Sequence, residues 1–400
     1  MLSFDEALER LLVAAVSVGE TRMLPLEATT GRVLAAPQKA VVSVPSLDNS
    51  AMDGYAVRVA DIGVAGTVLP VSQRIPAGSV GTPLQAGSAA RIFTGAPVPP
   101  GADAVVMQER CESAEGGVKI LHLPRPGENI RRIGEDIASG AEVLAAGIRL
   151  RPQDLALAAS AGLPSLPVYR RLRVAVFFTG DELRMPGEPL PPGAIYNSNR
   201  FALRALLEGL DCEVRDLGQV PDNLTATREA LRQAAGDNDL IITSGGVSVG
   251  EEDHVKPAVE AEGRLSLWKI AMKPGKPLAF GEVHSTGKRT WFIGLPGNPV
   301  SSFLTFLMLA RPFILKLQGI ARVLPHAYVV PADFEWNRAD ARTEFLRVRI
   351  NADGRLEIYP NQGSAVTTSL AWSDGLVRLP PETTVKRGDL LKFIPFSEVL

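Results

Sequence analysis

The order of apolar and polar residues changes character along the chain. Residues 3–6 form a capping-box pattern that leads into apolar positions with helical spacing, which predicts a helix over residues 3–16. From about residue 41 to residue 140 the apolar runs are short, rich in Val, Gly and Pro, and without a helical period. This stretch predicts a small β domain. A second helix is predicted after Arg151, because Pro152 suits the first turn of a helix.

From about residue 166 the predicted strands and helices alternate, which is typical of a doubly wound α/β domain with a largely parallel sheet. The predicted strands are 172–178, 212–217, 240–242, 267–270 and 290–293, and the predicted helices are 199–210, 224–235, 254–262 and 300–309. Beyond about residue 321, short strands with a turn at residues 351–354 predict a small C-terminal β-barrel. The pattern therefore predicts an α/β multidomain protein.

Composition and charge narrow the function classes. The 400 residues carry a formal net charge of −2 and no block of Lys and Arg, so no nucleic acid partner is expected. Cys111 and Cys212 are isolated and the four histidines are scattered, so spacing supports neither a disulfide framework nor a zinc cluster. A reducing, cytoplasmic location is expected. The most apolar segment, 303–310, stops at Arg311-Pro312, short of the ~20 residues that span a bilayer, so no membrane crossing is expected.

Polar residues follow the ends of five predicted strands in the α/β domain. In chain order they are Glu182, Asp222, the group Ser244, Gly245, Gly246 and Asp253, the pair Lys273 and Lys276, and the segment Gly294–Pro299. Open parallel sheets bind ligands outside the carboxyl ends of their strands, so these residues are predicted to converge on one crevice. The acids alone would repel a phosphate. An anionic substrate there requires Mg²⁺ between carboxylate and phosphate oxygens, with the lysines balancing the remaining charge.

A structural alternative explains each of these residues singly. Acids can cap helices, lysines can be solvated on a turn, and residues 244–250 can form a tight strand-to-helix turn. The coincidence at five strand ends favours a site. Neither nucleotide fingerprint is present, since residues 245–250 lack the G-x-G-x-x-G spacing and residues 274–277 lack the remaining residues of a P-loop. The β domain carries further polar loops at 48–56, 91–99 and 125–136. Taken alone, the first favours an Asx-turn over a catalytic role, and the other two are merely polar loops.

Taken in order, seven segments resemble the motif series of the molybdopterin molybdenumtransferases, the family of MoeA and the gephyrin E domain. They are Asp48–Ala56, Phe93–Pro97, Gly134–Asp136, Thr179–Leu183, Ser244–Ser248, Lys273–Pro277 and Leu295–Pro299. The resemblance implies an elongated helical and dimerisation region at 1–40 and 141–166, a β-rich domain at 41–140, a MogA-like α/β domain at 167–320 and a C-terminal β-barrel at 321–400. The division drawn from the hydrophobic pattern has the same layout.

The resemblance also implies a reaction, in which molybdate is inserted into adenylated molybdopterin with Mg²⁺-dependent release of AMP. Carried over by motif, the catalytic residues would be Asp53, Thr94, Asp136, Glu182, Asp222 and Asp253, of which Glu182 and Asp253 would hold Mg²⁺. The substrate-binding residues would be Ser244, Gly245, Gly246, Ser248, Gly250, Lys273, Lys276, Pro296, Pro299 and Ser364. For Ser364, a surface turn is the default interpretation.

In this family the β domain reaches the α/β cleft of a second subunit, so a homodimer is expected. Other proteins of molybdenum cofactor biosynthesis are further candidate partners. Three residues depart from the pattern: Phe178 stands where relatives often carry Ser, Asn197 where they commonly carry Asp, and His254 where an aromatic residue is usual. Two alternatives stay open. One is a molybdopterin adenylyltransferase, for which the β domain and the barrel would be superfluous, and the other is a non-enzymatic scaffold.

Overall fold

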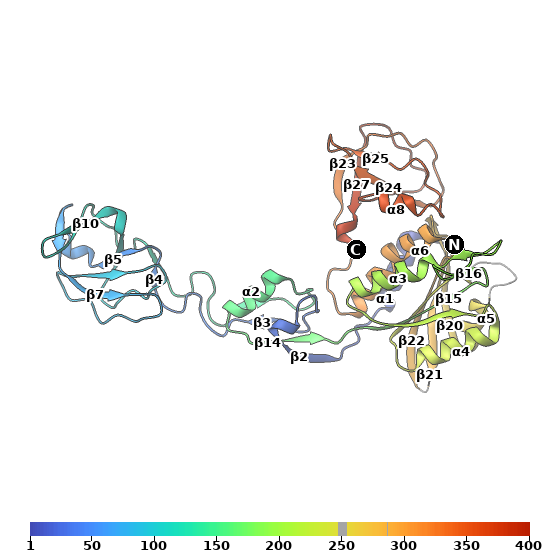
Figure 1. Cartoon of the computed structure of the whole chain (residues 1–400), viewed down its shortest axis with the longest axis horizontal. Coiled ribbons are helices and arrows are strands. Elements are labelled where there is room, and N and C mark those ends of the chain that lie inside the picture. The colour runs from blue at the N-terminus through green and yellow to red at the C-terminus, as the bar shows by residue number, and fades with distance from the viewer. Residues whose placement is uncertain (247–253, 286) are drawn as a thin grey trace.

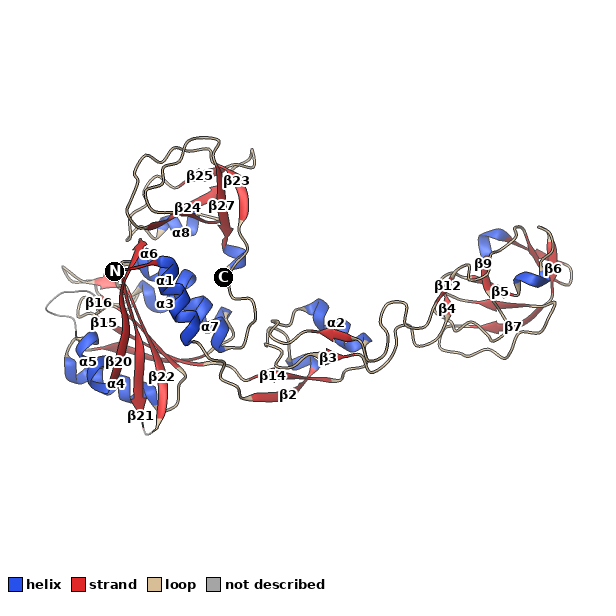
Figure 2. Ribbon diagram, turned by 180° about the vertical axis from the view of Figure 1, so that it is seen from behind, coloured by secondary structure: helices blue, strands red, loops and turns tan. Residues whose placement is uncertain are grey.

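The computed structural model describes residues 1–246, 254–285 and 287–400. The chain is elongated, with a β domain at one end, a narrow middle region, and an α/β domain beside a β-barrel at the other end (Figure 1). Both termini lie at the end that holds the α/β domain and the barrel (Figure 2). The polypeptide therefore runs out to the far end and returns.

The α/β domain is built on a mixed sheet. Its parallel part has the order β18 (Glu213–Val220), β15 (Arg173–Thr179), β19 (Leu240–Ser244) and β22 (Lys288–Leu295). The antiparallel strands β21 (Pro277–Ser285) and β20 (Gly263–Lys273) follow, and β1 (Leu2–Ser3) pairs with β20. Strand β21 was not predicted, because Pro277 and Gly281 interrupt its apolar pattern. The sheet is consequently less parallel than the sequence indicated.

Helices cover both faces of this sheet, as predicted for a doubly wound domain. One face carries α4 (Leu224–Ala235) and α5 (Val255–Glu262), and the other carries α1 (Phe4–Ala14), α3 (Ser198–Gly209), α6 (Pro299–Thr305) and α7 (Arg311–Leu317). Alternate residues of β15 supply the two cores: Val174 and Val176 pack with the second group, and Ala175 and Phe177 with the first. The strand is therefore apolar along its whole length, as expected of a strand buried on both faces.

The N-terminal helix forms as its sequence predicts. Ser3 and Glu6 make both hydrogen bonds of a capping box, and the helix buries Phe4, Ala7 and Leu11 in the core of the α/β domain. The prediction grouped these residues with the middle region. In the structure they belong to the packing of the α/β domain.

One helical run differs from its prediction. Helix α6 continues through a π-helical turn, Phe306–Ala310, into α7, so the helix does not stop at Arg311-Pro312. The regular hydrogen-bond pattern is already interrupted by the π-helical turn, so the missing N–H of Pro312 does not end the helix. The described residues thus contain one run, Pro299–Leu317, that is long and apolar enough to span a membrane. It is 83% buried, which is the character of a core helix.

The middle region is formed by two stretches distant in sequence. Strand β2 (Thr21–Pro25) pairs with β14 (Ser165–Tyr169), and β3 (Gln38–Lys39) pairs with β13 (Glu142–Leu144). A short 3₁₀ turn, Leu26–Ala28, and helix α2 (Pro152–Ser160) complete it, with Pro152 in the first turn as predicted. Its core includes Leu34, Leu150, Ala158 and Leu166.

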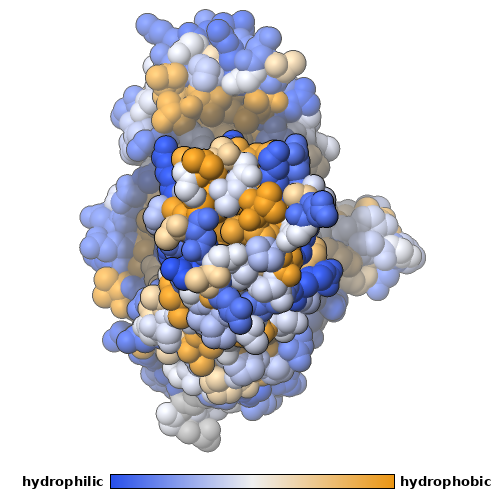
Figure 3. All heavy atoms as spheres, turned by 90° about the vertical axis from the view of Figure 1, so that its left-hand side faces the viewer, coloured by the Kyte–Doolittle hydropathy of each residue, from blue (hydrophilic) through white to orange (hydrophobic). Residues whose placement is uncertain are grey.

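The distal domain is built from short β-strands. One sheet has the order β7 (Val71–Ile75), β8 (Ala89–Ile92), β5 (Gly54–Val57) and β9 (Ala104–Met107), and another the order β10 (Cys111–Ala114), β11 (Gly117–Ile120) and β6 (Thr67–Leu69). Strands β4 (Asn49–Ser50) and β12 (Ile130–Arg131) form a short ribbon. Apolar residues are scattered among polar ones over the outer end of this domain (Figure 3), and Val64 and Val80 are examples of exposed ones.

The C-terminal region closes into a barrel, as predicted. The strand order is β25 (Leu356–Ile358), β24 (Thr343–Ile350), β26 (Gly375–Leu379), β27 (Leu390–Pro395) and β23 (Tyr328–Pro331). A bridge between Ala332 and Leu356 joins the last strand to the first. The predicted turn at residues 351–354 connects β24 to β25, with Gly354 at φ 71°. Helix α8 (Thr368–Trp372) lies against β24.

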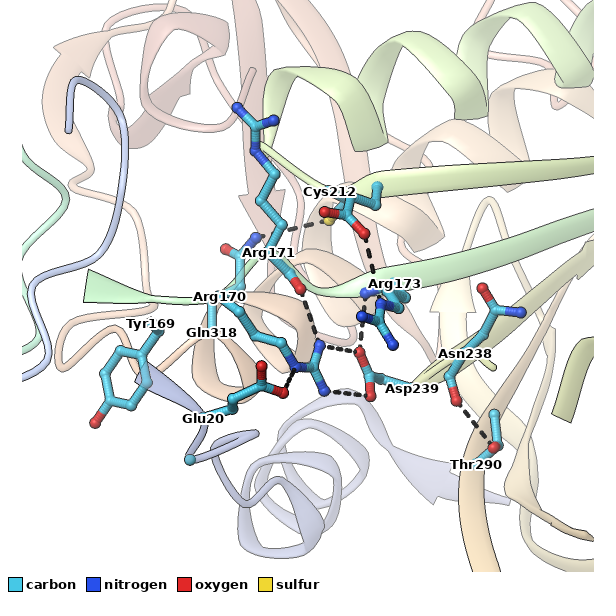
Figure 4. Close-up of polar contacts among 12 residues, drawn as sticks. Glu20, Tyr169, Arg170, Arg171, Arg173, Cys212, Asn238, Asp239, Thr290 and Gln318 are labelled. Atoms are coloured by element: carbon cyan, nitrogen blue, oxygen red, sulfur yellow. Dashed lines mark hydrogen bonds and ion pairs between the residues drawn. The ribbon is translucent and has the colours of Figure 1, made fainter. Parts of the chain in front are cut away.

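Arginine side chains tie the middle region to the α/β domain (Figure 4). Arg170 donates through its two terminal nitrogens to the carboxylate of Asp239, at 2.7 and 2.8 Å, and through Nε to Glu20, at 2.7 Å. Arg170 N also donates to Glu20 O at 2.9 Å. Arg171 and Arg32 both pair with Asp211. The two stretches of chain that cross between the regions are therefore held together by charge as well as by backbone contacts.

Candidate active site

A cleft of about 870 Å³ opens at the edge of the α/β sheet where β15, β19, β20 and β22 end. Strand β20 shares this edge because it is antiparallel to β21, which is itself antiparallel to β22. Of the residues predicted for the site, the cleft brings together Glu182, Ser244, Gly245, Lys273, Lys276, Pro296, Pro299 and Ser364. For those of the α/β domain, the structure shows the predicted convergence at the strand ends; Ser364 comes from the barrel.

Glu182 lies in the turn that follows β15. Gly180 adopts φ 137°, and a Cβ at this position would lie 2.7 Å from the carboxylate of Glu182. The carboxylate of Glu182 therefore lies against Gly180, which has no side chain to clash with it. Glu182 is exposed and lines the cleft. Across the described ranges, no cation pairs with this carboxylate. It is consequently available as an oxygen ligand for a hard cation.

Ser244 and Asn199 fix the loop that follows β19. Ser244 Oγ donates to Pro296 O at 3.0 Å and accepts from Asn199 Nδ2 at 2.8 Å. Asn199 Nδ2 also donates to Gly297 O at 2.7 Å, so one amide group joins two walls of the cleft. The loop continues through Gly245 and Gly246, at φ 96° and 61°, in the left-handed region where glycine is favoured.

The hairpin between β20 and β21 supplies the two predicted lysines, and the structure separates their roles. Lys273 pairs with Glu344 at 2.9 Å and with Asp340 at 3.2 Å, both on the barrel side. Burial opposes its charge, but hydrogen bonds to Glu344 and Asp340 outweigh burial and raise the pKa of Lys273. This lysine therefore links two domains. Lys276 lies exposed on the cleft wall.

The barrel contributes a wall of the cleft. Residues 362–365 line it, and Ser364 O accepts a hydrogen bond from Val300 N at 3.0 Å. Ser364 is thus part of the cleft and not of an isolated surface turn. Arg342 also lines the cleft and donates twice to Asp340, both at 2.9 Å. Hydrogen bonds from Arg342 and then Lys273 hold the pKa of Asp340 well below its usual range.

Several predicted residues lie outside this group. Asp222 follows β18 and is not among the residues that line the cleft; its N–H lies 3.5 Å from Asp181 Oδ1. Gly246 follows Gly245 in the loop and is not among the residues that line the cleft. Ser248, Gly250 and Asp253 fall outside the described residues. Among the residues that are described, no three His, Cys, Asp or Glu gather closely enough to hold a metal ion. The pairing of Glu182 with Asp253 at Mg²⁺ stays a prediction.

Three further predicted residues belong to a second polar cluster, in the distal domain. Asp53 Oδ1 accepts from Thr94 N and from Thr94 Oγ1, both at 2.8 Å. These two bonds lower the pKa of Asp53. Asp48 accepts from Ile133 N at 2.8 Å and from Arg132 Nη1 at 2.6 Å, which holds the segment that leads to the exposed Asp136. We call Asp48, Asp53, Thr94, Arg132 and Asp136 the distal cluster.

The distal cluster and the cleft are far apart within one chain. Strands β4 and β5, which flank Asp53, lie at the opposite end of the molecule from β15 and β20 (Figure 1). A single chain therefore does not bring Asp53, Thr94 or Asp136 to the residues of the cleft.

Sequence reasoning missed Asn199 and Arg342. Asn199 has a sequence signal, because it is a polar residue in the first turn of a predicted helix that begins at the same sheet edge. Arg342 has none, since it lies in a loop of a different domain. Of the three positions that differ from the family pattern, two have structural roles. Phe178 is buried in the core, and Asn197 caps α3 by accepting from Arg200 N at 3.2 Å. An amide preserves that acceptor. His254 directly precedes α5.

The fold and the cleft define a multidomain α/β protein with a cationic and glycine-rich pocket at the strand ends, a site suited to an anionic ligand. Three family profiles match the chain: MoeA N-terminal region (domain I and II) over residues 2–162, probable molybdopterin binding domain over 175–316, and MoeA C-terminal region (domain IV) over 329–396. The chain belongs to the molybdopterin molybdenumtransferase family.

Individual relatives support the same assignment. The chain is 42% identical to the molybdopterin molybdenumtransferase of Haemophilus influenzae, with all of both chains covered. It is 38% identical to that of a Nostoc species, over 92% of this chain and 87% of the relative. The crystal structure of the molybdopterin biosynthesis MoeA protein from Pyrococcus horikoshii OT3 matches with a TM-score of 0.86 at 27% identity, covering 99% of this chain and 100% of that one.

Proposed function

We propose that this chain inserts molybdenum from molybdate into adenylated molybdopterin, with Mg²⁺-dependent release of AMP. Membership of the molybdenumtransferase family supports the overall reaction. The observation that carries the proposal to this chain is the cleft itself, where Lys276, Arg342 and the loop at Ser244 and Gly245 line one cavity of about 870 Å³. That volume and charge suit a substrate with phosphate groups beside a second oxyanion.

The proposed reaction requires the residues of the cleft to orient the substrate and to neutralise its charge. It does not require a nucleophilic side chain. A phosphoanhydride that is cleaved beside a bound oxyanion depends on orientation and on electrostatic stabilisation. Lys276 and Arg342 would neutralise oxyanion charge, and the glycine loop would hold a phosphate with backbone N–H groups. Glu182 would hold Mg²⁺, which supplies charge stabilisation at the phosphate oxygens. Its exposed carboxylate, without a cationic partner in the described residues, fits a hard cation.

We further propose that the active form is a homodimer in which the distal cluster of one chain meets the cleft of its partner. The separation of the two half-sites within a chain supports this arrangement. A symmetric dimer would pair each cleft with the partner's distal cluster, giving two equivalent sites. Asp53, Thr94 and Asp136 would then act on a substrate bound in the partner's cleft.

Mixing two impaired variants, at a substrate concentration below the KM of the wild type, tests the reaction and the dimer together. Asp53→Asn removes a distal charge, and Lys276→Met removes a cleft cation. Each alone is expected to release little AMP from adenylated molybdopterin with molybdate and Mg²⁺. After the two are denatured and refolded as a mixture, random dimers with one intact site should restore about one quarter of the wild-type rate.

The outcomes separate the two parts of this proposal. No restoration, with light scattering still reporting dimers, would contradict the shared site. A wild-type protein that releases no AMP with molybdate and Mg²⁺ would contradict the reaction. A matched control is Glu112→Gln, which removes an exposed charge from the same domain outside the distal cluster, and it is expected to keep the wild-type rate.

A further inference from the structure

Thr179 ends β15 at the cleft, and its hydroxyl group has no hydrogen-bond partner within residues 1–246, 254–285 and 287–400. The residue is 3% exposed, lines the cleft, and its Oγ1 is buried. A buried hydroxyl without a partner destabilises the folded state, because it has lost its hydrogen bonds to water. Such groups are rare enough in native structures to need a cause. A substrate that accepts the hydrogen bond is one such cause.

The hydroxyl group lies against the glycine loop. A Cβ built on Gly245 would lie 3.2 Å from Thr179 Oγ1, and one built on Gly246 would lie 2.8 Å from it. Any side chain at these positions would crowd the hydroxyl. Left-handed glycines therefore keep the backbone of the loop and the hydroxyl group of Thr179 next to each other. Because Gly245 N already donates to Leu295 O at 3.2 Å, the hydroxyl group of Thr179 is the side-chain donor beside this part of the loop.

The hydroxyl group of Ser244 cannot serve in the same way. Its single proton is directed to Pro296 O at 3.0 Å, and its oxygen accepts from Asn199. Ser244 therefore has a structural role, because its hydroxyl group links the segment at Pro296 to helix α3 at Asn199. Of the described residues that line the cleft, Thr179 is one whose buried hydroxyl donor is left unused.

We infer that Thr179 donates a hydrogen bond to a phosphate oxygen of the substrate, while Ser244 holds the loop in position. The inference deepens the proposed function and rests on it, because the adenylated substrate supplies the phosphate. Thr179 is then a substrate-binding residue of the glycine loop site. Binding satisfies a buried donor that the described part of the free protein leaves unpaired.

Calorimetric titration with AMP and Mg²⁺ tests the inference on the full-length dimer. Thr179→Val keeps the shape and removes the hydroxyl, and it is expected to weaken AMP binding on the order of tenfold or more, the usual cost of a hydrogen bond to a charged group. Thr179→Ser keeps the donor and should stay close to the wild-type affinity. Without ligand, Thr179→Val should unfold at the same temperature as the wild type or higher, because a methyl group replaces an unpaired hydroxyl.

Thr243→Val is the matched control. Thr243 is also fully buried with an unpaired Oγ1, but it does not line the cleft, so its variant should bind AMP like the wild type. Ser244→Ala should lower the unfolding temperature, since it breaks the link to Asn199 and Pro296. Unchanged AMP affinity in Thr179→Val would overturn the inference, and so would equal losses in Thr179→Val and Thr243→Val.

Failure of the proposed function gives a different result. If the wild type does not bind AMP but binds inorganic phosphate, the adenylated substrate is contradicted and Thr179→Val is judged on phosphate affinity. If the wild type binds neither, both proposals are contradicted.

Discussion

The cleft and the distal cluster differ in the charge of their functional groups. In the cleft the groups that face the cavity include Lys276, Arg342 and the glycine loop, and they are set between two domains. In the distal cluster the prominent groups are carboxylates, held by short hydrogen bonds to Thr94 and Arg132 on exposed loops. The first arrangement suits an anion, and the second suits cationic or protonated groups. Neither set alone is complete for the proposed reaction.

The two regions are also stabilised differently. The cleft is assembled from residues far apart in sequence, such as Asn199 with Gly297 and Lys273 with Glu344. The distal cluster is likewise joined across sequence, but by carboxylates that accept backbone N–H groups. A carboxylate held this way keeps its charge at lower pH than usual. The comparison predicts that charge changes damage function at both sites, and that stability suffers mainly where ion pairs join domains.

The largest effect is expected at the distal cluster. Asp53→Asn keeps the shape of the side chain and removes its charge, so AMP release should fall on the order of 100-fold, as for loss of a preorganised charge in other sites. The unfolding temperature should change little, because Asp53 is exposed. Steady-state rates at saturating substrate check this, with Glu112→Gln as the control. A rate within threefold of the wild type would remove Asp53 from the site.

Smaller effects are expected at the two lysines, on AMP affinity for Lys276 and on stability for Lys273. Lys276→Met should weaken AMP binding on the order of tenfold and leave stability unchanged, because the side chain is exposed and makes no ion pair in the described residues. Lys273→Met should instead cost about 1–3 kcal/mol of stability, between the values for exposed and buried ion pairs. Calorimetric titration and chemical unfolding measure the two quantities. Equal behaviour of the two variants would contradict the separation.

The smallest effect is a dependence of stability on pH. The pKa of Asp340 is lowered in the folded state, so its contribution is fully present above its unfolded pKa of about 3.9 and is lost as the pH falls through the folded value. Asp340→Asn should therefore differ from the wild type in unfolding free energy at pH 7 and pH 5. The difference should shrink below about pH 4. A constant difference at all these pH values would exclude the ionised carboxylate as its cause.

The sequence predicts the local parts of this structure well. Helices α1 and α4 begin where capping residues and apolar spacing place them, and four of the five predicted strand ends in the α/β domain carry residues that meet in the cleft. The parts that it misses depend on distant pairing. Strand β21 is defined by its neighbours on both sides, and Pro312 lies inside a helix because a π-helical turn precedes it. No local pattern could reveal that Lys273 pairs with residues of the barrel.

The chain leaves the α/β domain for the middle region and returns from it at one place, where Arg170 N donates to Glu20 O at 2.9 Å. In topological terms, the middle region and the β domain form an insertion between α1 and β15, with adjacent ends. Adjacent ends permit excision, since a short linker from about residue 20 to residue 170 would span the gap. The shortened protein would retain the residues that line the cleft. The excised part, the middle region with the β domain, could then be added back as a separate polypeptide.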